Sequence, residues 1–137
     1  MVYKMVGALA QFDPNYMGLK EVVLNSEALE AYSALSFEAT KIDGYFHTHP
    51  AFIDALSQVG GFIMNANDNS NLEEEVFINH GWGGFRIFEP LQRDKEYQVH
   101  ARMCETPGRK WEGNLTILDA GRLIACFSKI VVSSFWL

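Results

Sequence analysis

Alternation between hydrophobic and polar residues is clearest between Tyr97 and Cys104. Every second side chain in this segment is suited to a core, and these residues are Tyr97, Val99, Ala101 and Met103. The residues between them are polar or small, and these are Gln98, His100, Arg102 and Cys104. A period of two is typical of a strand that has one buried and one solvent-exposed face. The segment therefore predicts a strand of an antiparallel sheet.

Further segments predict strands of the same kind, because they are apolar and bounded by turn residues. They cover residues 21–25, 31–38, 76–79, 85–88, 111–118 and 122–132. Turn signals lie at Gly83-Gly84, Pro107-Gly108 and Asp119-Ala120-Gly121. Near the start, Val2 to Gln11 contains good helix formers, and Asp13-Pro14-Asn15 ends the run. We expect a short leading helix over residues 1–12.

One long segment has the period of a helix instead, and it begins at Pro50, a residue favoured at the first helical position. Apolar residues recur at helical spacing, and polar or small residues form a second stripe at intervals of four, three and four. The apolar stripe is Phe52, Leu56, Val59 and Ile63, and the second stripe is Asp54, Gln58, Gly61 and Asn65. The segment predicts a largely buried helix that carries one polar line.

One long apolar helix among about six or seven antiparallel strands is the composition of a hot-dog fold, in which a curved sheet wraps around the helix. We therefore predict an α+β hot-dog fold, while an ordinary α+β sandwich fits the pattern nearly as well. The length of 137 residues suits one domain. We expect a single hot-dog half-domain over residues 1–137, with the leading helix at 1–12 and the core at 13–137.

Composition narrows the function classes. Hydrophobic residues make up 48% of the chain and charged residues 20%, which favours a folded protein over a disordered one. The formal net charge of -6 argues against nucleic-acid binding, which relies on clustered lysine and arginine. Cys104 and Cys126 lie far apart and lack a histidine at zinc-finger spacing, so no metal site is expected. The first residues form no membrane span and no convincing signal peptide, and we expect a cytoplasmic protein.

Asp54 is the residue in the helix that most needs an explanation, because burying an ionised group is costly. One interpretation is that it faces water near the helix start, where the helix dipole favours a negative charge. The other is a pocket: Gln58 can bind a carbonyl or Asp54 itself, Gly61 leaves a gap, and Asn65 extends the line. Gly60-Gly61 costs about 1 kcal/mol per residue relative to alanine, so close packing or ligand approach is expected there.

The four histidines offer no obvious partner for Asp54. His47 and His49 immediately precede the helix, where they are expected to cap or pack, and His100 lies on the solvent-exposed face of its strand. The remaining one, His80, follows Asn79. No nucleophile elbow, phosphate loop or dinucleotide fingerprint is present. The sequence thus favours a pocket that works without a cofactor.

The segment HPAFIDALSQ, residues 49–58, resembles the second-half motif of polyketide synthase dehydratase domains, which are double hot-dog proteins. Its continuation GGFIMNAN, residues 60–67, is closer still to the product-template domains of fungal non-reducing polyketide synthases. The resemblance extends to the leader VYKMVGALAQFDPNYMGLKEVVL and to VFINHGWGGFRIFEPLQRDKEYQVHARM. It covers nearly the whole chain.

This resemblance implies a C-terminal half-domain of a polyketide cyclase. Asp54 would be the catalytic aspartate, working with a histidine from the first hot-dog half, and Gln58 and Asn79 would support that pair. The substrate would be a poly-β-ketone held on the phosphopantetheine of an acyl carrier protein, with no other cofactor. The expected partners are that carrier and either the first half or a second copy of the chain, as in a homodimer.

Two alternatives stay open. The chain could be half of a dehydratase that acts on a 3-hydroxyacyl carrier thioester, since dehydration uses the same kind of acid and base. It could also be a non-catalytic hot-dog module that binds acyl chains or only dimerises.

Overall fold

The computed structural model describes residues 18–41 and 43–137. The predicted leading helix, residues 1–12, lies outside them. The described part contains seven strands and one long helix, α2, which spans Pro50–Ala66. The strands are β1 (Leu19–Asn25), β2 (Glu30–Ser36), β3 (Glu75–Gly81), β4 (Gly84–Ile87), β5 (Glu96–Thr106), β6 (Lys110–Asp119) and β7 (Arg122–Trp136).

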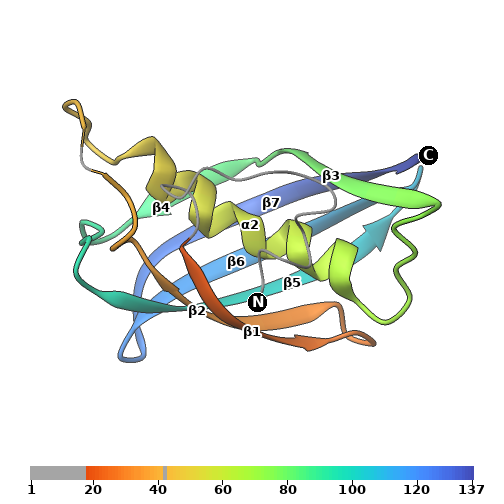
Figure 1. Ribbon diagram of the computed structural model, residues 1–137, viewed down its shortest axis with the longest axis horizontal. Helices are drawn as coiled ribbons and strands as arrows, with labels where there is room; N and C mark the ends of the chain where they lie inside the picture. The colour runs from red at the N-terminus through yellow and green to blue at the C-terminus, as the bar shows by residue number, and fades with distance from the viewer. Residues whose placement is uncertain (1–17, 42) are drawn as a thin grey trace.

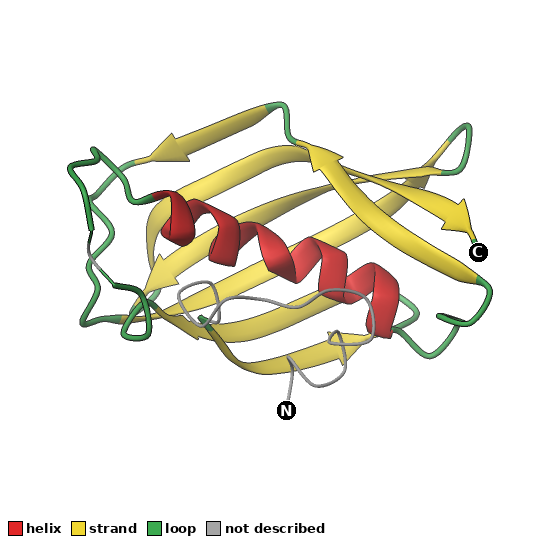
Figure 2. Cartoon of the chain, turned by 45° about the horizontal axis from the view of Figure 1, so that its top comes forward, coloured by secondary structure: helices red, strands yellow, loops and turns green. Residues whose placement is uncertain are grey.

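All seven strands belong to one antiparallel sheet, in the order β1-β2-β5-β6-β7-β3, with β4 paired to β7 beyond the end of β3. The sheet curves around α2, which lies across one of its faces (Figures 1 and 2). The predicted arrangement of one helix wrapped by a curved antiparallel sheet is confirmed. All six strands predicted beside the one at Tyr97 are present, with boundaries that differ by a few residues.

The core lies between α2 and the face of the sheet that it covers. Leu56, Val59 and Ile63 of the predicted apolar stripe are completely buried, and Phe52 stacks on Phe37 with ring centroids 4.0 Å apart. Full burial of an aliphatic side chain of this size stabilises a fold by roughly 1.5 to 3 kcal/mol. The sheet supplies the opposing side chains at alternate positions, including Val99, Ala101 and Met103 from β5, as predicted.

The ends of α2 are fixed by polar side chains. At the start, the backbone N–H of Ala51 donates to Nδ1 of His49, and Pro50 occupies the first helical position. At the end, the side chain of Asn67 donates to the carbonyls of Ile63 and Met64, 3.0 Å away in each case. These bonds satisfy backbone groups that a helix leaves without internal partners.

The connections between β5, β6 and β7 are tight. A two-residue turn, Ala120-Gly121, joins β6 to β7, and both residues have positive φ, at 49° and 80°. This conformation matches the twist of antiparallel strands, and glycine adopts it without strain. The hairpins hold β5, β6 and β7 in register beneath α2.

Candidate active site

The start of α2 is held by a histidine that joins the helix to the preceding loop. His49 accepts the N–H of Ala51 at Nδ1, so its Nε2–H donates to Asp43 Oδ1 at 3.0 Å. This hydrogen bond lowers the pKa of the Asp43 carboxyl below its ordinary value. The ring also lies against Phe46 and Phe52, with centroids 5.2 and 5.6 Å away. His49 therefore caps and packs, as predicted for it, and both ring nitrogens are engaged.

Asp54 lies one turn into α2 on its exposed side. Gln58 follows one turn later, and its Nε2 donates to Asp54 Oδ2 at 2.8 Å. The sequence left two partners open for Gln58, a substrate carbonyl or Asp54, and the structure shows the hydrogen bond to Asp54. The carboxylate faces solvent with one oxygen held by an amide, an arrangement suited to receiving a cationic or protonated group from outside the chain.

The two glycines of α2 have different surroundings. A Cβ on Gly60 would lie 3.4 Å from Ile130 Cγ2 and 3.7 Å from Met103 Sδ, so this glycine packs closely on the sheet. A Cβ on Gly61 would meet nothing within 4 Å in the described part of the chain. The close packing expected for the pair thus applies to Gly60. Gly61 leaves open space in the polar stripe.

Asn65, at the far end of the stripe, is buried and joins α2 to β3. Its Nδ2 donates to the carbonyls of Phe77 and Gly61, at 2.8 and 2.9 Å, and its Oδ1 accepts the N–H of Phe77 at 2.9 Å. Both amide hydrogens are therefore used within the protein. In the described residues, no buried side-chain nitrogen or oxygen lacks a hydrogen-bond partner.

Asn79 belongs to β3, two residues after Phe77, and therefore shares its face of the strand. Its Oδ1 accepts the N–H of Gly81 at 3.1 Å, where the pairing of β3 with β7 shifts register. The clamp at Asn65 and Phe77 brings the face of β3 that carries Asn79 alongside the polar stripe of α2. The structure thus joins Asp54 to Gln58 and Asn65 to β3, and no hydrogen bond links these two pairs.

The other histidines have partners elsewhere. In the described residues their side-chain hydrogen bonds are with Thr48 for His47, Ser133 for His80 and Glu30 for His100. None of these side chains, nor His49, forms a hydrogen bond or ion pair with Asp54 within residues 18–41 and 43–137. The described part of the chain also holds no cluster of three or more His, Cys, Asp or Glu side chains suited to a metal ion.

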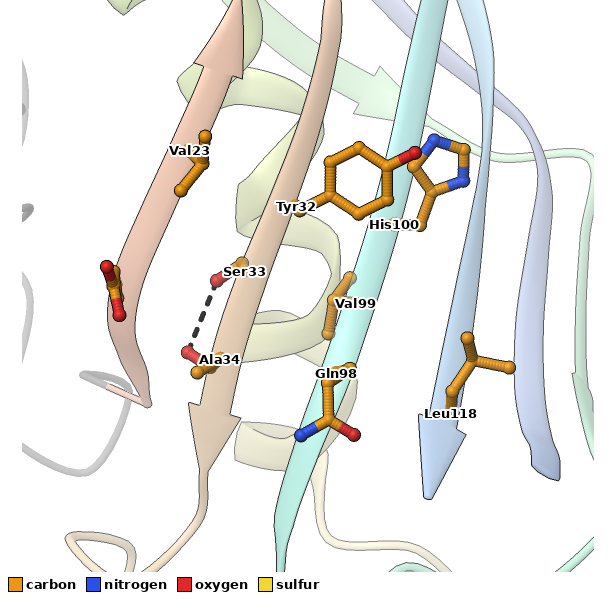
Figure 3. Close-up of a pocket in the computed structure, with 9 residues that line it drawn as sticks. Val23, Tyr32, Ser33, Ala34, Gln98, Val99, His100 and Leu118 are labelled. Atoms are coloured by element: carbon orange, nitrogen blue, oxygen red, sulfur yellow. Dashed lines mark hydrogen bonds between the residues drawn. The ribbon is translucent and has the colours of Figure 1, made fainter. Parts of the chain in front are cut away.

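A hollow of about 250 Å³ lies on the opposite face of the sheet, away from the polar stripe. Figure 3 shows it in front of β1, β2, β5 and β6, with the helix behind the strands. Val23, Ala34 and Leu118 contribute apolar lining, and Tyr32 stacks on His100 with centroids 4.5 Å apart. The sequence patterns do not predict this hollow.

His100, which lines this hollow, is held by a carboxylate that is not itself among the lining residues. His100 Nε2 donates to Glu30 Oε1 at 2.5 Å, and this bond lowers the pKa of Glu30. Most of the lining residues lie in two cross-strand rows, Glu21-Ala34-Gln98-Leu118 and Val23-Tyr32-His100. The sequence predicts that Gln98 and His100 share one face of β5. The residues that lie beside them depend on strand register, which local patterns do not give.

No helix among the described residues has both the length and the hydrophobicity to cross a membrane.

Sequence comparison relates nearly the whole chain to fungal enzymes. The non-reducing polyketide synthase VdtA of Byssochlamys spectabilis is 46% identical over 132 residues, which are 96% of this chain and 6% of that protein. The norsolorinic acid synthase stcA of Emericella nidulans is 42% identical over 126 residues, 91% of this chain and 6% of the relative. The chain therefore spans about 6% of the length of these relatives.

Solved structures with the same fold include dehydratase domains of polyketide synthases. The dehydratase domain from the CurJ module of curacin polyketide synthase has a TM-score of 0.70 and 14% identity, and the match covers 98% of this chain and 47% of that one. A dehydratase from a type I polyketide synthase has a TM-score of 0.76 and 15% identity, with coverages of 96% and 48%. The hot-dog fold is confirmed, and the chain matches somewhat less than half of each structure.

A family model described as the polyketide synthase dehydratase N-terminal domain matches residues 2–135. Its description names the N-terminal domain, whereas the HPAFIDALSQ motif resembles the second half of such proteins. The matched residues include the whole of α2 and all of the sheet except Trp136, the last residue of β7. With its hot-dog fold, its non-reducing polyketide synthase relatives and this match over nearly its full length, the chain belongs to the polyketide synthase dehydratase family.

Proposed function

We propose that this chain is part of a product-template domain and supplies the Asp54 side of a site for aldol cyclisation of a poly-β-ketone. The observation that carries the proposal is the carboxylate of Asp54, held at Oδ2 by Gln58 and otherwise open to solvent on a rigid helix. The relatives support the choice of substrate, since they are non-reducing polyketide synthases. A chain that is not reduced keeps its ketones, and these are the groups that aldol chemistry joins.

The reaction requires one base and one acid. A histidine from outside the described chain removes a proton from a methylene between two carbonyls, and Asp54 orients that imidazole and stabilises its positive charge. The enolate carbon then bonds to a distant ketone carbon. The π electrons of that C=O bond move onto its oxygen, and the resulting alkoxide takes the proton back from the imidazolium. Loss of water and enolisation give an aromatic ring. No metal or redox cofactor enters these steps, and the substrate arrives as a thioester on the phosphopantetheine of an acyl carrier protein.

In our proposal the residues of the polar stripe, and Asn79 beside it, have different roles. Gln58 sets the orientation of Asp54, Gly61 leaves room for the bound chain, and Asn79 offers an amide to a substrate carbonyl from β3. The predicted contact between Asn65 and substrate stays a prediction. Because its amide hydrogens are already used, we assign it to holding the wall of the pocket.

The site needs a second hot-dog unit. The described chain contains no histidine bonded to Asp54, and it matches somewhat less than half of each related dehydratase structure. We therefore propose that the chain works beside another half-domain, or beside a second copy of itself. In line with the HPAFIDALSQ motif, we assign it the aspartate-bearing half, although the matching family model carries the N-terminal description.

Dehydration is the second candidate, and the fold favours it, since the structural neighbours are dehydratase domains. The same pair would remove a proton from C2 of a 3-hydroxyacyl thioester and protonate the departing hydroxyl. This reaction needs a ketone that has already been reduced. We therefore rank cyclisation first, and the relationship to non-reducing synthases supports this order.

A binding or dimerisation module is the third candidate, and the absence of a histidine partner for Asp54 within the described residues favours it for the chain alone. It predicts assembly or acyl-chain binding without turnover in every combination of halves.

The decisive experiment incubates a carrier-bound poly-β-ketone with the chain, with and without an added complementary half-domain, and identifies ring products by mass spectrometry. We expect regioselective product only with both halves, and none with Asp54→Ala. Regioselective product that persists with Asp54→Ala would overturn the role of Asp54. Turnover of a 3-hydroxyacyl thioester without cyclisation would favour the dehydratase, and a native mass measurement would identify a homodimer.

A further inference from the structure

β3 is an edge strand whose outward-facing groups need partners. In the described part of the chain it pairs with β7 on one side only. In an antiparallel pair, the N–H and C=O of alternate residues point together toward the neighbouring strand or away from it. Outward groups on an open edge attract other strands unless they are covered.

Asn65 covers one such pair of groups. Its Oδ1 accepts the N–H of Phe77, and its Nδ2 donates to the C=O of the same residue. A residue on a neighbouring strand would make this same double hydrogen bond. The amide thus takes the place of a strand partner at Phe77, although it comes from α2. The side chain is nearly inaccessible, with 7% of Asn65 exposed.

The bond to α2 gives this contact a second role. Nδ2 also donates to the carbonyl of Gly61, one turn earlier in the helix, so the amide is bonded to both α2 and β3. The position of α2 relative to β3 is therefore fixed at one residue of each element. By strand alternation, Asn79 is the next residue whose backbone groups point outward from β3.

We propose that Asn65 is a positioning residue that closes the edge of β3 at Phe77 and fixes the register of Asn79 against α2. A strand from a second unit can then pair with β3 beyond Phe77, at its Asn79 end, because on the other side the N–H of Glu75 already donates to the carbonyl of Asn71. The consequence for catalysis rests on the proposed function, whereas the closed edge does not.

Amide hydrogen exchange tests the closed edge directly. In the unmodified protein we expect the Phe77 amide to exchange at least tenfold more slowly than in an unstructured peptide. In Asn65→Ala we expect this protection to fall about tenfold or more, since a bound N–H becomes exposed. In Asn65→Asp the oxygen that replaces Nδ2 would face the carbonyls of Phe77 and Gly61, so we expect the protection to fall there as well.

Asn67→Ala is the matched control. It removes an asparagine amide from the same end of α2, and its lost bonds are to Ile63 and Met64 of the helix itself. We expect it to leave exchange at Phe77 unchanged. An unprotected Phe77 amide in the unmodified protein would overturn the proposal even if no variant folded. Equal loss of protection in Asn65→Ala and Asn67→Ala would overturn it as well.

Kinetics of the assembled cyclase test the effect on Asn79. We expect Asn65→Ala and Asn79→Ala to be non-additive in kcat/KM, because the first change already displaces the second residue. Asn67→Ala and Asn79→Ala should be additive. Additive effects of Asn65 and Asn79, with slow exchange at Phe77, would remove the catalytic role and retain the closed edge. Absence of all cyclisation would instead count against the proposed function, and the exchange results would still stand.

Discussion

Gln58 Nε2 donates to Asp54 Oδ2 over 2.8 Å, across one turn of α2. Residues four apart lie on the same face of a helix, so the bond requires no long-range contact. It limits the rotation of the carboxylate and leaves it on the solvent side of the helix. In the proposed cyclase the two side chains would have separate roles, since Asp54 would orient the histidine base and Gln58 would orient Asp54.

The first prediction concerns Asp54→Asn, which preserves the size of the side chain and removes its charge. In the assembled cyclase we expect the rate to fall by about 10² to 10⁴-fold, the usual contribution of general acid–base catalysis, because the histidine base would lose the carboxylate that orients it. The midpoint of thermal unfolding should change little, because exposed substitutions usually alter stability by less than about 0.5 kcal/mol. Rate assays and calorimetry on the same sample would check both. A variant that cyclises at the original rate while folded would contradict the proposed role.

Gln58→Glu tests the orienting bond. The new carboxylate lies one turn from Asp54, where like charges destabilise a helix by about 0.2 to 0.5 kcal/mol. We expect cyclisation to fall while the fold survives. Gln58→Ala, which removes the amide and adds no charge, serves as the control for repulsion. If both variants retained the full rate, Gln58 would have no part in orienting Asp54.

The paired glycines predict opposite outcomes. Gly61→Ala should stabilise the protein by about 0.5 to 1 kcal/mol, since alanine favours a helix and no described atom lies within 4 Å of its Cβ. Gly61→Leu should fold as well and reduce cyclisation by filling the stripe. The matched variant Gly60→Leu faces Ile130 and Met103 and should lower the unfolding midpoint instead. Unfolding curves and product yields distinguish the two positions, and similar destabilisation at both would contradict the open space at Gly61.

Gly113 provides a further stability prediction in β6. A Cβ there would lie 2.3 Å from both the carbonyl oxygen of Arg102 and Sδ of Met103. A backbone atom cannot give way cheaply, and we expect Gly113→Ala to destabilise by about 1 to 3 kcal/mol. Chemical denaturation would measure this loss. Gly108→Ala serves as a comparison for strain from a positive φ, 84°, in a place where the described residues leave open space. A Gly113→Ala protein as stable as the original would refute the close approach of β5 to β6.

Local periodicity explains why much of the fold could be predicted from the sequence. The alternation from Tyr97 predicts the buried face of β5, and the apolar stripe from Phe52 predicts the buried face of α2. Pro50 predicts the start of the helix. Strand ends were less predictable, because pairing decides them. β7 continues to Trp136, beyond the predicted end at Val132, since its last residues pair with Glu75 and Val76 of β3.

The candidate site divides in the same way. The bond between Asp54 and Gln58 follows from helical spacing and could be predicted from the sequence. The clamp from Asn65 to Phe77 depends on how α2 packs against β3, and Asp43 reaches His49 through the conformation of a loop. The contact between Tyr32 and His100 depends on the register of β2 with β5. Local patterns contain no information on these three relationships.

The last prediction concerns pH and the ion pair between Lys95 and Asp119, whose Nζ and Oδ2 lie 2.8 Å apart. The hydrogen bond raises the pKa of Lys95 and lowers the pKa of Asp119. A lowered carboxyl pKa stabilises the fold above the unfolded value and loses this contribution as the pH falls through the folded value. A raised lysine pKa stabilises below the unfolded value and loses its contribution as the pH rises through the folded value. The ion pair therefore stabilises the fold around neutral pH, and this contribution is lost in strong acid and in strong alkali.

Lys95→Met removes the pair and should lower the unfolding midpoint by a constant amount between about pH 5 and 9, away from the usual pKa values of both groups. The difference from the unmodified protein should shrink in acid below the ordinary pKa of aspartate, and again in alkali above that of lysine. Because both groups are partly exposed, salt should reduce the difference. Lys110→Met, at the start of β6, controls for the loss of one positive charge. A difference that grew in acid would contradict the sign of the Asp119 shift.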